Sequence, residues 1–341
     1  MSKFEIPYLT DVFSTLGQQL SCPDAELTYT IQNECQYNAW FTGASVEQAV
    51  KAIGEMLNKN DLQTWLNGYE IKAHVPKKVG LVLAGNIPLV GFHDVLCVLI
   101  SGNFALIKAS SQDARLITQV LKRLVEIEPA FEQRFDFTER LKDFDAVIAT
   151  GSNNSSRYFE YYFGKVPHII RKNRNSVAVL TGAETTEQLH ALGHDIFDYF
   201  GLGCRNVSKL FVPQGYDFVP FFEAIEPYKN IINHHKYNNN YDYNKSIYLV
   251  NRDKHLDNGF LLVKEDEHMV SPLAVLFFEY YDAIDALENK LKQESEKIQC
   301  IVTAPPLGGG GLSTVSFGQS QQPALWDYAD GVDTMDFLTK L

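Results

Sequence analysis

The sequence has few cysteines, little positive charge and no long apolar run, and each shortage excludes a class of protein. Its 341 residues include five cysteines, without a Cys-x-x-Cys pair, so neither a disulfide framework nor a zinc site is expected. The formal net charge of -12 at pH 7 argues against a nucleic-acid-binding protein, which would carry a basic surface. No apolar run is long enough to span a bilayer. Residues 1–11 lack a charged region followed by an apolar one, so we expect no signal peptide and a cytoplasmic protein with reduced thiols.

The composition is that of a globular protein, with 45% hydrophobic and 12% aromatic residues, and the length suits one large α/β unit or two domains. Short apolar runs at residues 79–84, 104–108 and 146–149 have the character of buried strands. The residues between them repeat at helical spacing, and 79–108 have the size of one βαβ unit. The sequence therefore predicts an α/β fold with a doubly wound parallel sheet.

The alternation is looser in the second half of the chain. We expect a helix over residues 188–199 and strands near residues 210–212, 247–250, 260–263, 275–278 and 298–302. Residues 238–244 (NNNYDYN) are polar and indicate turns. A domain boundary is predicted near residues 181–185.

Cys204 is the first candidate for chemistry, because it lies in the segment Phe-Gly-Leu-Gly-Cys-Arg-Asn. Glycines allow the backbone to approach a ligand closely, and Arg205 with nearby backbone N–H groups would lower the pKa of the thiol. The same residue is equally consistent with a buried cysteine that serves as a small apolar side chain. Cys97 lies in an apolar helical run and Cys300 in a strand, so we expect both to be structural.

Three loops that follow the N-terminal strands are the second group of candidates, because ligands of open α/β sheets bind beyond the carboxyl ends of strands. No Gly-x-Gly-x-x-Gly fingerprint is present. Asn86 offers an amide to a developing oxyanion, and Lys108 with two serines suits ribose or phosphate. Each loop, taken singly, can also have a purely structural role in a turn. In that interpretation Ser111 caps the following helix and Lys108 lies at a solvated strand end. The candidates are Gly85, Asn86 and Pro88 in the first loop, Lys108, Ser110 and Ser111 in the second, and Gly151 and Ser152 in the third.

Taken together, these motifs resemble the aldehyde dehydrogenase superfamily. Gly-Asn-x-Pro, Lys-x-Ser-Ser, Thr-Gly-Ser and Gly-x-x-Cys occur in that order, and Val-Ser-Phe-Gly at residues 315–318 is similar to the superfamily's late Pro-Phe-Gly-Gly segment. The segments LAGNIPLVGFHDVL, FGLGCRNVSKLFVP and FGQSQQPALWDYADGVDT resemble the acyl-CoA reductase branch, which includes the fatty-acid reductase subunit of bacterial luminescence.

The resemblance implies a domain organisation and a role for each candidate. Residues 1–182 would form N-terminal helices and a dinucleotide-binding domain, 183–305 a catalytic α/β domain, and 306–341 a segment that packs back at the domain interface. Cys204 would be the nucleophile that accepts the acyl group, and Asn86 with the backbone N–H of Cys204 would form the oxyanion hole. No metal is implied, and a homodimer is compatible with the family. The cofactor would be held by Gly85, Pro88, Lys108, Ser110, Ser111, Gly151, Ser152 and Phe317.

The sequence departs from the superfamily's pattern in ways that bear on the reaction. Aldehyde-oxidising members carry a glutamate that activates the deacylating water, whereas residues 170–175 (IRKNRN) contain no carboxylate, so hydrolysis of a thioacyl enzyme should be slow. Ala109 replaces the family's usual proline. Arg171, Lys172 and Arg174 are either a solvated strand end, which we favour, or a contact for the phosphates of CoA. Glu265 and Glu267 are both candidates for a ribose contact, and neither is assigned.

The sequence thus predicts NAD(P)H-dependent reduction of an acyl-CoA or another acyl thioester to an aldehyde. NADPH is favoured over NADH because Lys108 suits a 2′-phosphate and its loop lacks an acidic residue. Three alternatives stay open: an acyl-phosphate reductase of the glutamyl-phosphate reductase type, a cysteine acyltransferase or thioesterase subunit that needs a partner, and a non-catalytic dinucleotide-binding scaffold.

Overall fold

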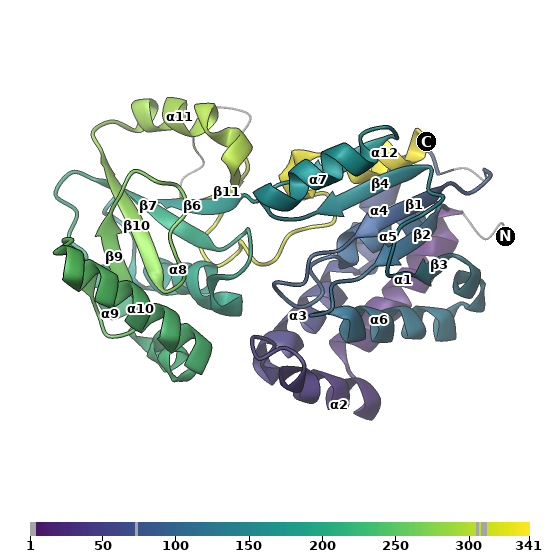
Figure 1. The fold of residues 1–341 in the computed structure, drawn as a ribbon, viewed down its shortest axis with the longest axis horizontal. Helices are drawn as coiled ribbons and strands as arrows, with labels where there is room; N and C mark the ends of the chain where they lie inside the picture. Colours follow the sequence, from purple (N-terminus) through teal and green to yellow (C-terminus); the bar gives the residue numbers. More distant parts are fainter. Residues whose placement is uncertain (1–4, 72–73, 305–306, 308–311) are drawn as a thin grey trace. The chain divides into compact units, whose positions relative to one another are not determined.

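The computed structural model of the chain describes residues 5–71, 74–304, 307 and 312–341 and divides into two compact units (Figure 1). The first unit consists of Met1–Asn173 together with Pro323–Leu341, and the second of Arg174–Gln322. Both contain a largely or wholly parallel sheet with helices packed on it. The predicted doubly wound α/β class is therefore confirmed.

The first unit is built on a five-stranded sheet in the order β3-β2-β1-β4-β5, in which every pair of neighbours is parallel. The chain adds β2 and β3 on one side of β1 and then returns to add β4 and β5 on the other side. This reversal places a topological switch point between β1 and β4, where α/β sheets bind their ligands. The strands are β1 (Lys78–Val82), β2 (Phe104–Lys108), β3 (Phe135–Phe137), β4 (Ala146–Thr150) and β5 (His168–Arg171).

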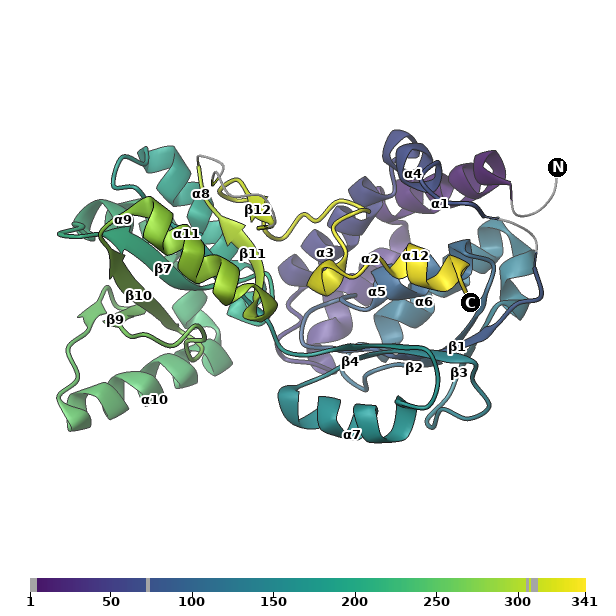
Figure 2. The same cartoon turned by 90° about the horizontal axis from the view of Figure 1, so that it is seen from above.

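The helices of the first unit cover the two faces of this sheet unequally. Figure 2 shows α7 on one face and α5, α6 and α12 on the other. The N-terminal helices extend the same core, since α1 buries Leu9, Phe13 and Leu16 along one stripe. The helices are α1 (Ile6–Ser21), α2 (Ala25–Asn33), α3 (Gly43–Met56), α4 (Lys59–Leu66), α5 (Phe92–Ile100), α6 (Ala114–Ile127), α7 (Asn153–Phe163) and α12 (Thr334–Thr339).

The second unit has a seven-stranded sheet in the order β12-β11-β6-β7-β10-β9-β8. All neighbours are parallel except β8 and β9, which are antiparallel. The strands are β6 (Asn175–Val179), β7 (Val207–Pro213), β8 (Leu256–Asp257), β9 (Leu262–Glu265), β10 (Val275–Tyr281), β11 (Ile298–Val302) and β12 (Thr314–Val315).

Both faces of the second sheet are buried. Alternate residues of β6 point to opposite faces: Ala178 joins the cluster that contains Leu189 and Leu192 of α8, whereas Val177 joins the cluster with Leu287 of α11. Because both faces carry apolar side chains, the strands contain short apolar runs such as residues 177–179 of β6 and 275–278 of β10. The helices of this unit are α8 (Thr186–Phe197), α9 (Val219–Ile225), α10 (His235–Asn251) and α11 (Ile284–Gln293).

The prediction for residues 238–250 is wrong, because the segment expected to form turns and a strand lies within α10. The buried residues Tyr237, Tyr241, Asn244 and Tyr248 recur every three or four positions, which is the spacing of one helix face. This face is made of tyrosine and asparagine rather than aliphatic residues, so an apolar pattern did not reveal it.

The division between the units also differs from the predicted boundary near residues 181–185. It falls at Asn173 and Arg174, because β6 pairs with β7 and β11 and is therefore part of the second sheet. The predicted boundary at 305 lies outside the described residues. The C-terminal segment is shared, since the second unit extends to Gln322 and the first takes up the chain at Pro323. That this segment packs at a domain interface stays a prediction.

Within the described residues, no helix is both long and apolar enough to cross a membrane.

Candidate active site

The predicted cofactor loops of the first unit gather at one edge of its sheet. They follow β1, β2 and β4, which are neighbours and parallel, so their carboxyl ends lie together at the switch point. Asn86, Lys108, Ser111 and Ser152 are exposed there, whereas Gly85 and Pro88 are buried and Ser110 and Gly151 are half-buried. Within the first unit, the structure thus brings together Asn86 and all the predicted cofactor residues of these three loops.

Two glycines in these loops are required by close packing. A Cβ atom on Gly85 would lie 2.5 Å from Oγ of Ser110, so the loops after β1 and β2 touch at this point. A Cβ atom on Gly151 would lie 2.7 Å from the Phe159 ring of α7. The resulting surface consists of backbone and small side chains, the type of surface that accepts a pyrophosphate at a helix N-terminus.

The serines of these loops have different roles. Oγ of Ser152 is the N-cap of α7 and accepts a hydrogen bond from the backbone N–H of Ser155 at 3.2 Å. Ser111 does not cap α6, whose N-cap is Asp113. Oγ of Ser110 accepts from the N–H of Gln112 at 3.3 Å. Only Ser111 is left as an exposed hydroxyl group that neither caps a helix nor closes a turn.

Asp113 is a residue of this edge that the sequence did not reveal. Its carboxylate is buried and accepts a hydrogen bond at 2.8 Å from the backbone N–H of Leu89, a residue held at φ 57°. Burial raises the pKa of Asp113 to about 8, and the second carboxylate oxygen is buried without a hydrogen-bond partner. Asp113 thus fixes the end of the loop that carries Asn86. Nothing local in the sequence signals this contact, because Leu89 is distant along the chain.

Cys204 belongs to the second unit, in the loop between the 3-10 turn η3 (Asp198–Gly201) and β7, and its side chain is exposed. Asn206, which was not predicted, holds this loop. Its Oδ1 accepts from the N–H of Gly203 at 2.8 Å, and its Nδ2 donates to the carbonyl oxygens of Asp195 and Asp198 at 3.2 and 2.9 Å. Oγ of Ser176 on β6 donates to the carbonyl oxygen of Cys204 at 3.1 Å. The backbone on both sides of the thiol is therefore fixed.

A left-handed turn precedes Cys204. Tyr199, Phe200 and Gly201 have φ values of 53°, 60° and 77°, a conformation that costs each of the two non-glycine residues about 1–2 kcal/mol. Phe200 is held by its ring, whose centroid lies 4.3 Å from that of His234. Strained backbone of this kind persists where the surrounding structure over-determines it, and it clusters at functional sites.

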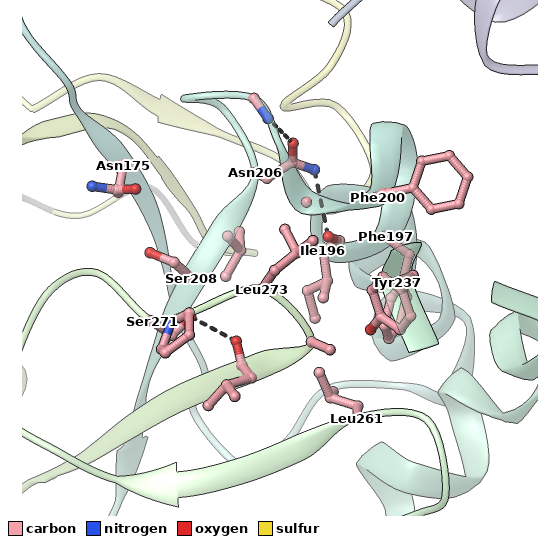
Figure 3. A pocket seen from close by; sticks show the side chains of 16 residues that line it. Asn175, Ile196, Phe197, Phe200, Asn206, Ser208, Tyr237, Leu261, Ser271 and Leu273 are labelled. Carbon is pink, nitrogen blue, oxygen red and sulfur yellow. Dashed lines mark hydrogen bonds between the residues drawn. The ribbon is translucent and has the colours of Figure 1, made fainter. Parts of the chain in front are cut away.

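A small cavity of about 60 Å³ adjoins this turn. Figure 3 shows Phe197, Phe200 and Tyr237 on one side of it and Ser208 and Ser271 on the other. Gly203, the residue before Cys204, also lines it. Most of the remaining lining is apolar: Ile196, Leu261, Leu273, Ala274 and Val275.

The other cysteines lie in different settings. Cys97 and Cys300 are buried, and burial raises the pKa of Cys97 well above its usual value. Cys22 and Cys35 are exposed, but they lie at the end of α1 and in the short turn after α2. No group of three His, Cys, Asp or Glu side chains that would hold a metal ion is found in the described part of the chain.

Phe317 is the one predicted cofactor residue that does not belong to these loops. It belongs to the second unit and its ring is buried in the core beside α8 and β7. Two of the three cations at residues 171–174, for which a solvated strand end was favoured over a phosphate contact, have protein partners. Arg171 is buried against Asp94, and Arg174 donates to the carbonyl oxygens of Ser295 and Ile298. Arg171 is therefore neither a solvated strand end nor a phosphate contact. Lys172 is exposed and pairs with Glu160.

Three comparisons with known proteins bear on this chain. The family model described as acyl-CoA reductase (LuxC) matches residues 37–220, just over half of the chain. Among curated proteins, none matches the sequence.

The chain is also similar to solved aldehyde dehydrogenase structures. One is aldehyde dehydrogenase 21 from Physcomitrella patens in complex with the reaction product succinate, with a TM-score of 0.69, 11% identity and coverage of 99% of this chain and 84% of that one. Another is the indole-3-acetaldehyde dehydrogenase AldA from P. syringae in complex with NAD+ and IAA, with a TM-score of 0.67, 12% identity and coverage of 92% and 77%. At this identity the likeness establishes the aldehyde dehydrogenase fold.

Proposed function

Because the chain belongs to the LuxC acyl-CoA reductase family and is an enzyme of this type, we propose that it reduces an acyl-CoA, or another acyl thioester, to the aldehyde with NADPH, through an acyl group carried on Cys204. The observation that carries the proposal is the placement of Cys204, an exposed thiol in a glycine-flanked loop whose backbone is held by Asn206 and Ser176. NADH is the second choice of cofactor.

Cys204 is the nucleophile of the proposed reaction. Its thiolate attacks the thioester carbonyl, the bond from the carbonyl carbon to the CoA sulfur breaks, and CoA leaves as a thiolate that takes up a proton. Arg205, the next residue, favours the thiolate form of Cys204 by its positive charge. Asn86, exposed at the end of β1, and the backbone N–H of Cys204 donate to the oxyanion that develops on the carbonyl oxygen.

The loops at the switch point fit a nicotinamide dinucleotide. Gly85 and Gly151 leave no room for a Cβ atom, so backbone lines this edge, and the N-terminus of α7 favours a pyrophosphate there. Lys108 is exposed beside Ser111, while Asp113, the nearby acid, is buried and bonded to Leu89. A cation in a loop whose one acidic residue is buried suits a 2′-phosphate, which favours NADPH. When bound, the reduced nicotinamide supplies a hydride to the acyl carbon.

The acyl group on Cys204 then has two fates, release as an aldehyde or hydrolysis. Residues 170–175 contain no carboxylate to activate a water molecule, and Arg171 in this segment is buried in an ion pair. Without a base in this segment, we expect hydrolysis of the acyl enzyme to be slow. After reduction, the carbon–sulfur bond to Cys204 breaks, the aldehyde carbonyl forms and the thiolate is regenerated.

The test combines a substitution with two measurements. Purified protein is incubated with acyl-CoAs of different chain length, and the mass of the intact protein and the absorbance of NADPH are followed. We expect Cys204→Ala to abolish both the acyl adduct and NADPH consumption, while Cys35→Ala, which changes another exposed cysteine, leaves both unchanged.

The same measurements separate the alternatives. Acylation without NADPH consumption, restored by a second protein, would indicate an acyltransferase or thioesterase subunit. Turnover of acyl phosphates but not of acyl-CoAs would indicate the acyl-phosphate reductase. Cofactor binding that survives Cys204→Ala, together with a thiol that accepts no acyl group, would contradict the proposal and leave a non-catalytic scaffold.

A further inference from the structure

The C-terminal half of α8 anchors two segments that are distant in sequence. One is the loop of residues 203–206, whose Asn206 side chain donates to the carbonyl oxygens of Asp195 and Ile196 on α8. The other is the turn of residues 317–320, whose backbone is bonded to the Asp195 side chain. Both contacts lie within the second unit. The Cys204 loop and this turn therefore share one anchor.

The side chain of Asp195 accepts hydrogen bonds from the backbone of the turn. It is fully buried, and its two carboxylate oxygens accept hydrogen bonds from the backbone N–H groups of Gly318 and Ser320 at 2.6 and 2.9 Å. A buried carboxylate that lost these donors would keep the cost of its desolvation without compensation. The turn is thus held firmly against α8.

Gly318 allows the turn to reach α8. It has a φ of 78°, which favours glycine, and a Cβ atom on it would lie 3.2 Å from Cβ of Ala191, one helical turn before Asp195. The turn is therefore held by the carboxylate of Asp195, and it can lie close to α8 because Gly318 has no side chain.

Arg205 links the turn directly to the nucleophile loop. Its Nη1 donates to the carbonyl oxygen of Ser320 at 3.3 Å, and Arg205 is the residue that follows Cys204. Asp195 and Arg205 thus bind the same residue of the turn, one at its N–H and the other at its carbonyl oxygen. The position of the guanidinium group depends on where Asp195 holds Ser320.

We propose that Asp195 is a positioning residue for the nucleophile: by fixing the turn of residues 317–320, it holds the guanidinium group of Arg205 in the place from which its charge activates Cys204. This role deepens the proposed function, because it rests on Cys204 as the nucleophile. Asp195 acts through Arg205 and does not itself touch the substrate.

The test is the rate at which iodoacetamide alkylates Cys204 at pH 7, measured by peptide mass spectrometry. Iodoacetamide is neutral, so the rate reports the thiolate of Cys204 and not attraction of the reagent. Cys22 and Cys35 are exposed and serve as internal references in the same molecule. Asp195→Asn keeps the size of the side chain but places an amide N–H against one of the two backbone donors. We expect it to slow alkylation of Cys204 about tenfold and to leave the two reference cysteines unchanged.

A double-mutant cycle with Arg205→Gln distinguishes positioning from general loosening of the fold. If Asp195 acts through Arg205, the double variant is about tenfold slower than the wild type, like each single variant, and not about a hundredfold slower. Additive effects, an unchanged rate in Asp195→Asn, or equal changes at all exposed cysteines would overturn the proposal. Glu187→Gln, at the exposed N-terminal turn of the same helix, is the matched control and should not change the rate.

Gly318→Ala provides a second route if Asp195→Asn does not fold. It disturbs the same turn without removing a buried charge, and we expect slower alkylation of Cys204 alone. The result is also separable from the proposed function. If the cycle behaves as expected while no acyl-CoA acylates Cys204, the acyl-CoA reductase assignment fails and the positioning role stands.

Discussion

At the residue scale, the polar side chains that hold the candidate site act on backbone that is distant in sequence. Asp113 bonds to Leu89, Ser176 to Cys204, and Asp195 to Gly318. The exposed candidates were predictable because they follow strands and belong to recognisable motifs. The residues that hold these candidates in place could not be predicted, because the sequence around an aspartate or serine is the same whether its side chain faces solvent or bonds to buried backbone.

Asp113 makes the stability of the fold depend on pH. Its pKa is raised by burial from 3.8 to about 8, so between these values the folded chain holds a proton that the unfolded chain has released. Stability therefore falls as pH rises through this window, by at most about 1.4 kcal/mol per pH unit, and levels off above it. Asp113→Asn cannot titrate, and its amide oxygen still accepts from Leu89.

The free energy of unfolding of wild type and of Asp113→Asn can be measured by urea denaturation from pH 5 to pH 9. As pH rises to about 8, the wild type should lose stability relative to the variant. Other titrating groups cancel in this difference. If the free energy of unfolding of the two proteins changed with pH in parallel, Asp113 would be ionised in the folded protein over this range.

At the element scale, β1, β2 and β4 were foreseen from their apolar runs, whereas the short strand β3 and the helix α10 were not. A strand that is buried on both faces is a continuous apolar segment and needs no periodicity to be seen. Helix α10 buries the rings of Tyr237, Tyr241 and Tyr248. The hydroxyl group of Tyr237 donates to the carbonyl oxygen of Phe260, and that of Tyr241 donates to Oδ1 of Asp257. The face of α10 is chemically mixed, so composition suggested turns although the spacing was helical.

Helix α8 allows a prediction at this scale, because it begins with a complete capping box. Oγ1 of Thr185 accepts from the backbone N–H of Gln188, and the Gln188 side chain accepts from the N–H of Thr185. Thr185→Ala should lower the free energy of unfolding by about 1 kcal/mol, measured in urea. Thr186→Ala, one position later and exposed, removes a hydroxyl group outside the cap and should not destabilise. An equal loss in both variants would show that the cap itself contributes little.

At the scale of the whole molecule, the first unit is discontinuous in sequence. Residues 323–341 return to it after the entire second unit and complete its core with Leu325, Met335 and Leu338. Arg171 at the end of β5 donates to Oγ1 of Thr334, and Trp65 donates to the hydroxyl group of Tyr328. The resemblance implied that residues 306–341 pack back at the domain interface, which stays a prediction, whereas the structure assigns residues 323–341 to the first unit. Which core this segment enters depends on long-range contacts that no local pattern encodes.

Removal of residues 323–341 should therefore destabilise the first unit selectively. The four side chains of Leu325, Tyr328, Met335 and Leu338 are buried, and their loss costs on the order of 5 kcal/mol or more, a large part of the stability of a typical domain. Hydrogen exchange should show lost protection in β1 and α5, with protection retained in β7 and β10, whose cores contain none of these residues. Lys340→Ala removes only an exposed ion pair with Asp336 and should leave both units protected. Equal loss in both sheets would instead mean that the two cores unfold as one cooperative unit.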